Sequence, residues 1–235
     1  MILPSGNDAG VQCARYFGSI LLEHSEVVEK ESEGLKSSVK SLKELRDEQD
    51  IFVAKNSHFR KVKSIIAFLA QMNRNCATIG MHNSLYDSPH GLGNPNNKST
   101  AFDQTLLVSE CLKDPRFVPI THKRNHRVKA SKENGNSKDY FWDLVENNGM
   151  VELAGYTAIK SGWTPNAGSC LATVCELSPH HPLIIMIIGC KMKYEERKYR
   201  CLETVKIAKW VTQRVAGSVP ARSRSGAVKP KPMRF

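Results

Sequence analysis

The stretch YTAIKSGWTPNAGSC, residues 156–170, determines the fold that we predict for this chain. Its β-branched and aromatic residues predict a strand that ends in a Lys-Ser-Gly triplet at residues 160–162. Pro165 and Gly168 predict a turn, after which a second strand begins. The triplet is therefore expected at the rim of a sheet, where a lysine and a hydroxyl group can face a ligand.

The sequence around this stretch favours strands followed by one helix. Three runs rich in β-forming residues and joined by short turns predict an antiparallel meander. They are Val151–Trp163, Ser169–Leu177 and Leu183–Lys191. A closing helix is predicted over Glu195–Val215. A helical half followed by a small antiparallel sheet and a closing C-terminal helix predicts an α+β fold.

The first half of the chain shows apolar residues at helical spacing. The predicted helices are Ala9–Glu23, Ser64–Gly80 and Ala101–Lys113. Thr100 and Asp103 predict a capping pair at the start of the third helix, and Phe102 is expected to face inward. Two polar segments, Asn83–Asn97 and Lys123–Asp139, are predicted to be loops.

Charge is distributed unevenly along the chain. At about residues 25–63, acidic and basic residues are mixed and no wide apolar stripe accompanies them, which predicts a charged insertion in the domain. Residues 216–235 carry five Lys or Arg and no acid among many Pro, Gly and Ser, so we predict a disordered basic tail. The tail supplies +5 of the net charge of +11, which leaves +6 for the rest. This modest remainder disfavours a nucleic-acid-binding protein.

The residue types present point to no metal, cofactor or membrane span. The 7 cysteines have irregular spacings and form no Cys-x-x-Cys, so neither a metal nor a redox site is predicted. The longest apolar run, Leu183–Ile188, is too short to cross a bilayer. The first residues lack the features of a signal peptide, and the sequence assigns no compartment.

Several short motifs, taken in order, resemble the low-molecular-weight penicillin-binding proteins, the serine-type D-alanyl-D-alanine carboxypeptidases. The segments that carry the resemblance are Ser5–Ala9, Met72–Arg74, Ile79–Asn83, Ser88–Leu92, Ser99–Asp103 and Lys160–Thr164. One such triplet alone is weak evidence, whereas their shared order is specific. The resemblance implies a partial β-lactamase/transpeptidase-like domain over residues 1–215.

The resemblance also implies roles for five residues. Ser5, in the Ser-x-Asn motif, would be catalytic and help to move a proton to the leaving amine. Asn7 would hold the substrate amide, and Lys160 would meet the terminal carboxylate of a D-Ala-D-Ala-type peptide. Ser161 would add a hydroxyl group, and Gly162 would let the backbone pass close to the substrate. His90 is interpreted as a structural loop residue and is left out of the site.

One departure from the family concerns the nucleophile. In the family, a Ser-x-x-Lys motif precedes Ser-x-Asn and supplies the serine that forms the acyl-enzyme. Only four residues precede Ser5, so we expect an N-terminally truncated domain that is inactive as given. A Ser-x-x-Lys occurs at Ser37–Lys40, but it follows Ser5 and lies in the charged insertion, so we interpret it as a coincidence.

Three functions remain open at this point. The first is a carboxypeptidase-like serine peptidase, and the second is a non-enzymatic peptide- or β-lactam-binding protein that keeps the Lys160 cleft. The third is a nucleic-acid-associated protein that uses the basic tail. A truncated domain would also leave an exposed edge on the sheet of Lys160, which predicts marginal stability or association.

Overall fold

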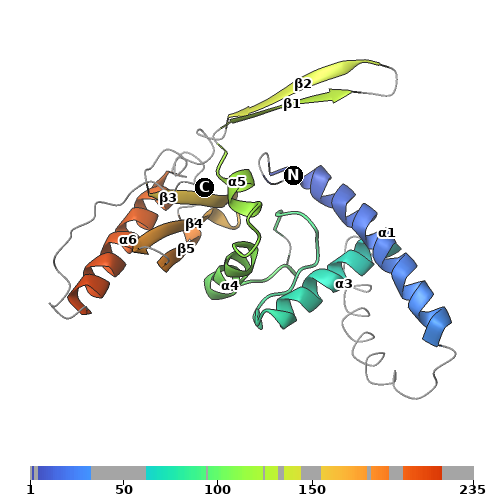
Figure 1. The fold of residues 1–235 in the computed structure, drawn as a ribbon, viewed down its shortest axis with the longest axis horizontal. Helices are drawn as coiled ribbons and strands as arrows, with labels where there is room; N and C mark the ends of the chain where they lie inside the picture. Colours follow the sequence, from blue (N-terminus) through green and yellow to red (C-terminus); the bar gives the residue numbers. More distant parts are fainter. Residues whose placement is uncertain are drawn as a thin grey trace. The chain divides into compact units, whose positions relative to one another are not determined.

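The structure of the protein is a computed structural model. It describes residues 2, 5–32, 62–93, 95–123, 125–131, 135–143, 155–178, 181–190 and 198–218. These residues fall into two compact units, with the boundary between Asp103 and Gln104. Figure 1 gives the order of the helices and strands in each unit.

The first unit is built on two helices. Helix α1 spans Asn7–Ser32 and helix α3 spans Lys63–Thr78. Their apolar residues meet in a core whose fully buried members are Ala14, Ile65 and Leu69. The helix predicted over Ser64–Gly80 is confirmed, and the helix predicted over Ala9–Glu23 is longer than expected. It continues through the first eight residues of the stretch that we predicted as an insertion.

Glycines allow α1 to approach its neighbours closely. A Cβ atom added to Gly18 would lie 1.8 Å from the backbone oxygen of Ser64, the second residue of α3. A Cβ atom added to Gly10 would lie 2.9 Å from the carbonyl oxygen of Pro89, in the loop that follows α3. Because backbone atoms cannot yield as a flexible side chain can, both positions require a residue without a side chain.

The polar loop predicted over Asn83–Asn97 is confirmed, and a buried carboxylate holds its base. Asp103 Oδ2 accepts hydrogen bonds from the backbone N–H of Asn83 at 2.9 Å and from Ser84 Oγ at 2.7 Å. These bonds, that of Ser84 first, lower the pKa of Asp103. An isolated bridge between Leu85 and Lys98 closes the loop, so it is an ordered part of the unit.

Helix α4, Ala101–Cys111, begins as the sequence predicts. The backbone N–H of Asp103 donates to Thr100 Oγ1 at 3.1 Å, which confirms the capping pair. The prediction for Phe102 is wrong, because its side chain is 69% exposed. Asp103 occupies the buried position at the start of the helix, since its carboxylate has hydrogen-bond donors to meet there and a phenyl ring has none.

The second unit contains the predicted meander. Strands β3 (Tyr156–Thr164), β4 (Gly168–Ser178) and β5 (His181–Cys190) form an antiparallel sheet in the order β3-β4-β5. Gly168 has a φ of 67°, a left-handed conformation that suits glycine at the end of the β3–β4 turn. Within the described strands, β3 and β5 are the two edges of this sheet.

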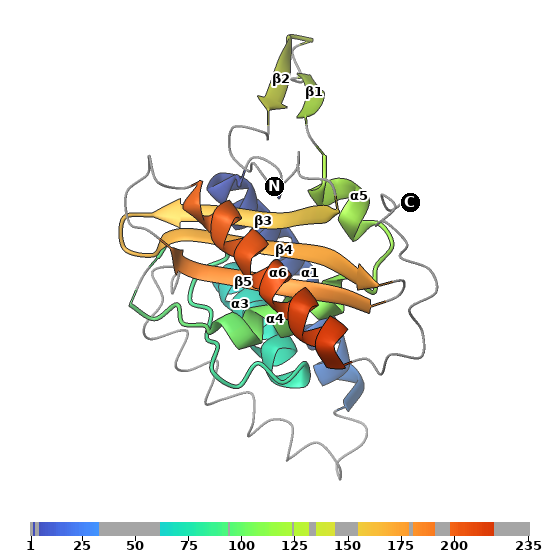
Figure 2. The same ribbon diagram turned by 90° about the vertical axis from the view of Figure 1, so that its left-hand side faces the viewer.

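Both faces of the three-stranded sheet are covered. Helix α6, Tyr199–Ser218, crosses one face (Figure 2) and contributes Ala208 to a core with Leu171 and Ile185. On the other face, Val108 of α4 packs with Ile159 of β3, together with residues of the short helix α5, Phe117–Thr121. The closing helix predicted from the sequence is confirmed, and so is the α+β class.

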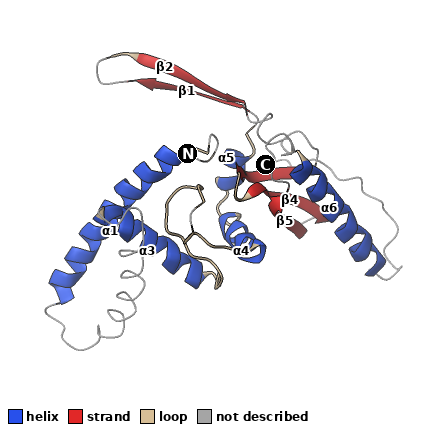
Figure 3. Cartoon of the chain, turned by 180° about the vertical axis from the view of Figure 1, so that it is seen from behind, coloured by secondary structure: helices blue, strands red, loops and turns tan. Residues whose placement is uncertain are grey.

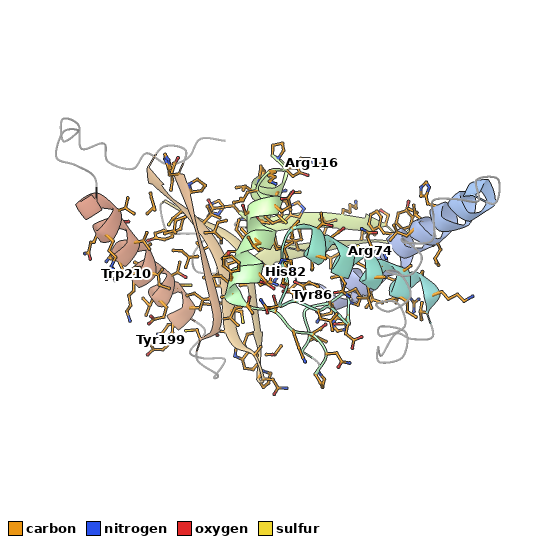
Figure 4. All side chains as sticks on the ribbon, turned by 90° about the horizontal axis from the view of Figure 1, so that it is seen from below. Arg74, His82, Tyr86, Arg116, Tyr199 and Trp210 are labelled. Carbon is orange, nitrogen blue, oxygen red and sulfur yellow. The ribbon has the colours of Figure 1, made fainter. Side chains whose placement is uncertain are left out.

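Helix α6 buries a stripe that is mostly polar. Arg200 and Thr204 are 4% and 0% exposed, and Ala208 continues the stripe one turn later. Trp210, labelled in Figure 4, is 55% exposed and lies under the guanidinium of Arg214, whose Cζ is 4.3 Å from the ring centre. The helix therefore faces the sheet through its arginine and threonine more than through its largest apolar side chain.

The loop predicted over Lys123–Asp139 is wrong. Strands β1 (Asn125–Ser131) and β2 (Ser137–Asp143) pair antiparallel as a ribbon of their own, shown in red in Figure 3. Gly135, in the connection between them, has a φ of 81°. The polar composition concealed the strands because side chains on both faces of the ribbon are exposed, so no apolar alternation marks it.

Some expectations fall on residues outside the described ranges. The structure does not describe residues 33–61, which make up most of the predicted insertion, or residues 219–235 of the predicted tail. The assignment of residues 1–215 to one partial domain stays a prediction. Among the helices that the structure does describe, none combines the length and apolar character that a bilayer span requires.

We expect Gly18→Ala to lower the free energy of unfolding of the first unit by about 1–3 kcal/mol, because the new methyl group must displace the backbone of Ser64. Thermal or urea unfolding followed by circular dichroism measures the effect. Gly91→Ala is the matched control, since an added Cβ atom there meets nothing within 4 Å. Equal stability of the two variants would contradict the close packing of α1 on α3.

Candidate substrate-binding site

The Lys-Ser-Gly triplet lies on β3, an edge strand of the sheet, as the sequence predicts. The pairing of β3 with β4 shifts between Ala158 and Lys160, which marks a β-bulge. After the bulge, Lys160 pairs with Ala172. Because cross-strand partners share a face, Lys160 lies on the face of Ala172, away from α6. The bulge thus sets the direction in which the lysine leaves the sheet.

Lys160 is exposed and has an unusual electrostatic environment. Its ammonium group donates a hydrogen bond to the backbone oxygen of Ser161. Partial desolvation lowers the pKa of Lys160, and the positive charge of Arg200 lowers it further. A carboxylate placed beside the ammonium would oppose both effects, since it would stabilise the charged form. The site is therefore electrostatically prepared for an anion.

Arg200 supports the triplet from the first turn of α6. Its Nη1 donates to the carbonyl oxygen of Gly162 at 3.1 Å and to that of Cys170 at 3.4 Å. Gly162 and Cys170 are cross-strand partners, so one guanidinium holds both strands at the end of the triplet. The arginine is 4% exposed, so its charge acts through a poorly hydrated environment.

Space is available at Gly162, the last residue of the triplet. An added Cβ atom there would meet no atom within 4 Å, whereas residues 157–159 of β3 are buried. Gly162 does not need its glycine for packing or for a left-handed φ. An absent side chain at this position instead leaves the backbone of the edge strand open to a ligand.

Ser5 and Asn7 belong to the first unit. Asn7 is the first residue of α1 and is exposed, in line with the predicted helix start. Ser5 has a φ of 52°, and it is the one described residue other than glycine with a positive φ. A serine in this conformation is uncommon and often marks a functional position. The structure brings Lys160, Ser161, Gly162 and Arg200 together, and it describes Ser5 and Asn7 in the other unit.

The chemistry available in the second unit is that of anion recognition. The ammonium group of Lys160 and the buried guanidinium of Arg200 lie at the same edge strand. Ser161 pairs with Leu171, so its side chain lies on the face of α6, opposite to that of Lys160. In the parts of the chain that the structure describes, no three His, Cys, Asp or Glu side chains are placed to hold a metal ion. Lys160 can bind a carboxylate by a charge-assisted hydrogen bond.

A known protein family matches the part of the chain that contains the Lys-Ser-Gly triplet. The model of D-alanyl-D-alanine carboxypeptidase, peptidase S11, matches residues 63–191, which is more than half of the chain and includes the triplet. This protein belongs to the D-alanyl-D-alanine carboxypeptidase family. Ser5, Asn7 and Arg200 lie outside the matched residues.

Individual members of the D-alanyl-D-alanine carboxypeptidase family match over part of their length. The chain is 28% identical over 147 residues to D-alanyl-D-alanine carboxypeptidase DacA of Haemophilus influenzae, covering 61% of this chain and 33% of that protein. It is 30% identical over 113 residues to the D-alanyl-D-alanine carboxypeptidase of Streptomyces sp. K15, covering 47% and 37%. The chain thus spans about a third of the length of these relatives.

A solved structure shows the same fold. The Streptomyces K15 DD-transpeptidase superimposes with a TM-score of 0.56 at 21% identity, over 69% of this chain and 62% of that one. This similarity confirms the predicted fold class as a partial domain of the transpeptidase type. Family membership, predicted from the motif order, is confirmed as well.

Sequence reasoning missed Arg200. The predicted closing helix was interpreted through its apolar residues, such as Leu202 and Trp210, and both are more than half exposed. The available signal was the four-residue spacing of Arg200, Thr204 and Ala208, which places them on one face. A helix face that carries an arginine is normally interpreted as the solvent-exposed face. Only the packing in the folded chain identifies this face as buried.

We expect Arg200→Met to raise the pKa of Lys160, because it removes the nearby positive charge and leaves the desolvation. Binding of a carboxylate ligand requires the charged lysine and is lost as the pH rises through this pKa. The alkaline midpoint should therefore lie below the ordinary lysine value of about 10.4 in the unaltered protein and move upward in the variant. A pH titration of ligand binding, or of the lysine resonance by NMR, measures it.

Arg200→Lys is the control for this titration. It keeps the positive charge and loses the guanidinium, whose Nη1 donates to two carbonyl groups. The midpoint should therefore stay near that of the unaltered protein. Circular dichroism establishes that both variants fold. A midpoint that stays fixed or falls in a folded Arg200→Met protein would contradict the coupling of the two cations.

Proposed function

We propose that this protein is a D-Ala-D-Ala carboxypeptidase homologue whose β3 edge binds the C-terminal end of an acyl-D-Ala-D-Ala peptide. The observation that carries the proposal is the pair of cations, Lys160 and Arg200, at an open edge strand. In this binding mode, Lys160 holds the terminal carboxylate and the backbone at Gly162 runs beside the peptide. An edge strand suits a peptide in extended conformation, which can add to the sheet as a further strand.

Ser5 and Asn7 complete the proposal on the catalytic side. Ser5 would relay a proton to the leaving amine, and Asn7 would hold the substrate amide. The positive φ of Ser5 supports a functional role, because such a conformation costs of order 1–3 kcal/mol that folding must offset elsewhere. These roles follow the Ser-x-Asn motif, which lies outside the residues matched by the family model.

We propose that the 235-residue chain binds such peptides with negligible turnover. The sequence contains one Ser-x-x-Lys, Ser37–Lys40, which follows Ser5 and lies outside the described residues. The acyl-enzyme route needs a serine with an adjacent base. This order of the two motifs favours the non-enzymatic alternative. That alternative is a peptide- or β-lactam-binding protein that keeps the Lys160 cleft.

Binding is tested by calorimetry with an acyl-D-Ala-D-Ala peptide and with the same peptide as its C-terminal amide. We expect Lys160→Gln to weaken binding of the acid by about 10- to 100-fold, because a charge-assisted hydrogen bond is worth roughly 1.5–3 kcal/mol. Binding of the amide should be nearly unchanged, since it lacks the charge. Lys113→Gln, at an exposed lysine paired with Glu110 in the same unit, is the matched control.

Two results would contradict the proposed binding mode. One is equal weakening of the acid and the amide by Lys160→Gln, which would mean that the carboxylate is not the partner of the lysine. The other is no weakening of either peptide. A correctly folded Lys160→Gln protein, checked by circular dichroism, is required in both cases.

Turnover is tested separately by intact mass spectrometry after incubation with a reactive penicillin. We expect no covalent adduct on the 235-residue chain. A stable adduct on one serine would show that an active nucleophile is present, and peptide mapping would identify it. Ser37 would then be the first residue to mutate, with Ser38→Ala as its control.

A further inference from the structure

The β1–β2 ribbon carries a cation over an aromatic ring on each of its two faces. On one face, the Cζ of Arg127 lies 5.9 Å from the ring centre of its cross-strand partner Phe141. On the other, the ammonium of Lys138 lies 5.1 Å from the ring centre of Tyr140. Neighbouring residues of a strand point to opposite faces, so Tyr140 and Phe141 present their rings on opposite sides.

These side chains are exposed, and none of them belongs to a hydrophobic core among the residues that the structure describes. Phe141 is 57% exposed, Tyr140 is 41% exposed, and Val128, the cross-strand partner of Tyr140, is 39% exposed. A two-stranded ribbon alone is marginally stable in water and normally gains stability from a third strand or a packing partner. Exposed aromatic rings beside cations are therefore surface on which a partner can be bound.

The charge of the ribbon limits the class of partner. Its described residues include three cations, Arg127, Lys129 and Lys138, against the two carboxylates of Asp139 and Asp143, a net charge of +1. Nucleic-acid-binding surfaces depend on dense clusters of Lys and Arg that neutralise many phosphates. A net charge this low does not provide such a cluster.

The two-sided arrangement limits the geometry of the partner. A flat bilayer can contact one face of a ribbon and leaves the other in water. A ribbon with equivalent aromatic and cationic groups on both faces suits a partner that surrounds it, such as a polymer mesh. The rings can pack on the apolar C–H faces of sugars, and the cations can meet peptide carboxylates.

We propose that the β1–β2 ribbon binds a glycan polymer that bears carboxylate-containing peptides, as peptidoglycan does, and that it retains the protein on this polymer. This inference rests on the proposed function, because it takes the polymer to be the carrier of the peptide that Lys160 binds. The ribbon acts as a second contact with the polymer, and the site at Lys160 contacts the peptide terminus.

The test is co-sedimentation of the full 235-residue chain with purified, insoluble peptidoglycan. We expect the double variant Tyr140→Ser, Phe141→Ser to bind about tenfold more weakly, and Arg127→Gln, Lys138→Gln to be weakened in the same direction. The second variant keeps the rings, so it tests the cations in a ribbon that retains its aromatic residues. Trp210→Ser, Arg214→Gln on α6 is the matched control, since it removes an exposed cation–π pair elsewhere.

Peptidoglycan binding that is lost in the ribbon variants and kept in the α6 variant supports the proposal. Unchanged sedimentation of the ribbon variants overturns it, as does equal loss in the α6 variant. Equal or tighter binding of the unaltered protein to single-stranded DNA or to anionic phosphatidylglycerol vesicles also overturns it, because it would assign the ribbon to another class of partner.

The soluble peptide assay separates this inference from the proposed function. The ribbon variants should bind an acyl-D-Ala-D-Ala peptide as the unaltered protein does, whereas Lys160→Gln should not. A protein that binds the soluble peptide and fails to sediment with peptidoglycan retains the proposed function and overturns the inference alone. Failure of the soluble peptide to bind refutes the proposed function whatever the sedimentation shows.

Discussion

The hydrogen bonds of Arg200 hold together the part of the molecule that carries the Lys-Ser-Gly triplet. Burying a guanidinium costs several kcal/mol, so it is retained only where good acceptors meet it. Here the acceptors are backbone carbonyl groups of two adjacent strands, at Gly162 and Cys170. The same charge that joins α6 to the sheet also lowers the pKa of Lys160. Arg200 therefore contributes both to the packing of α6 on the sheet and to the electrostatics of the site.

The strands of the second unit could be predicted because local chemistry and burial agree there. Residues 156–170 combine β-forming residues with a turn at Pro165 and Gly168, and the sheet that results is buried on both faces. The triplet could be placed at a strand edge for the same reason. Its supporting arginine could not, because the partners of Arg200 are backbone carbonyl groups, which have no signature in the sequence.

Other errors have a different physical origin. Phe102 is exposed, and the neighbouring Asp103 takes the buried position, where Asn83 and Ser84 supply hydrogen-bond donors to its carboxylate. The β1–β2 ribbon was missed because alternation reveals a strand only when one face is buried. Both cases depend on which side chains become buried in the folded chain, a property that residue types alone do not encode.

The bulge between Ala158 and Lys160 lets two consecutive residues of β3 share one face of the sheet. If regular pairing continued from Ala158, Lys160 would stand opposite Leu171, and its side chain would point into the core beneath α6. The extra residue instead allows Ile159 to pack in the core with α4 and Lys160 to follow it directly on the same face. The strand therefore passes from buried core to charged surface between two neighbouring residues, without a turn and without a break in the sheet.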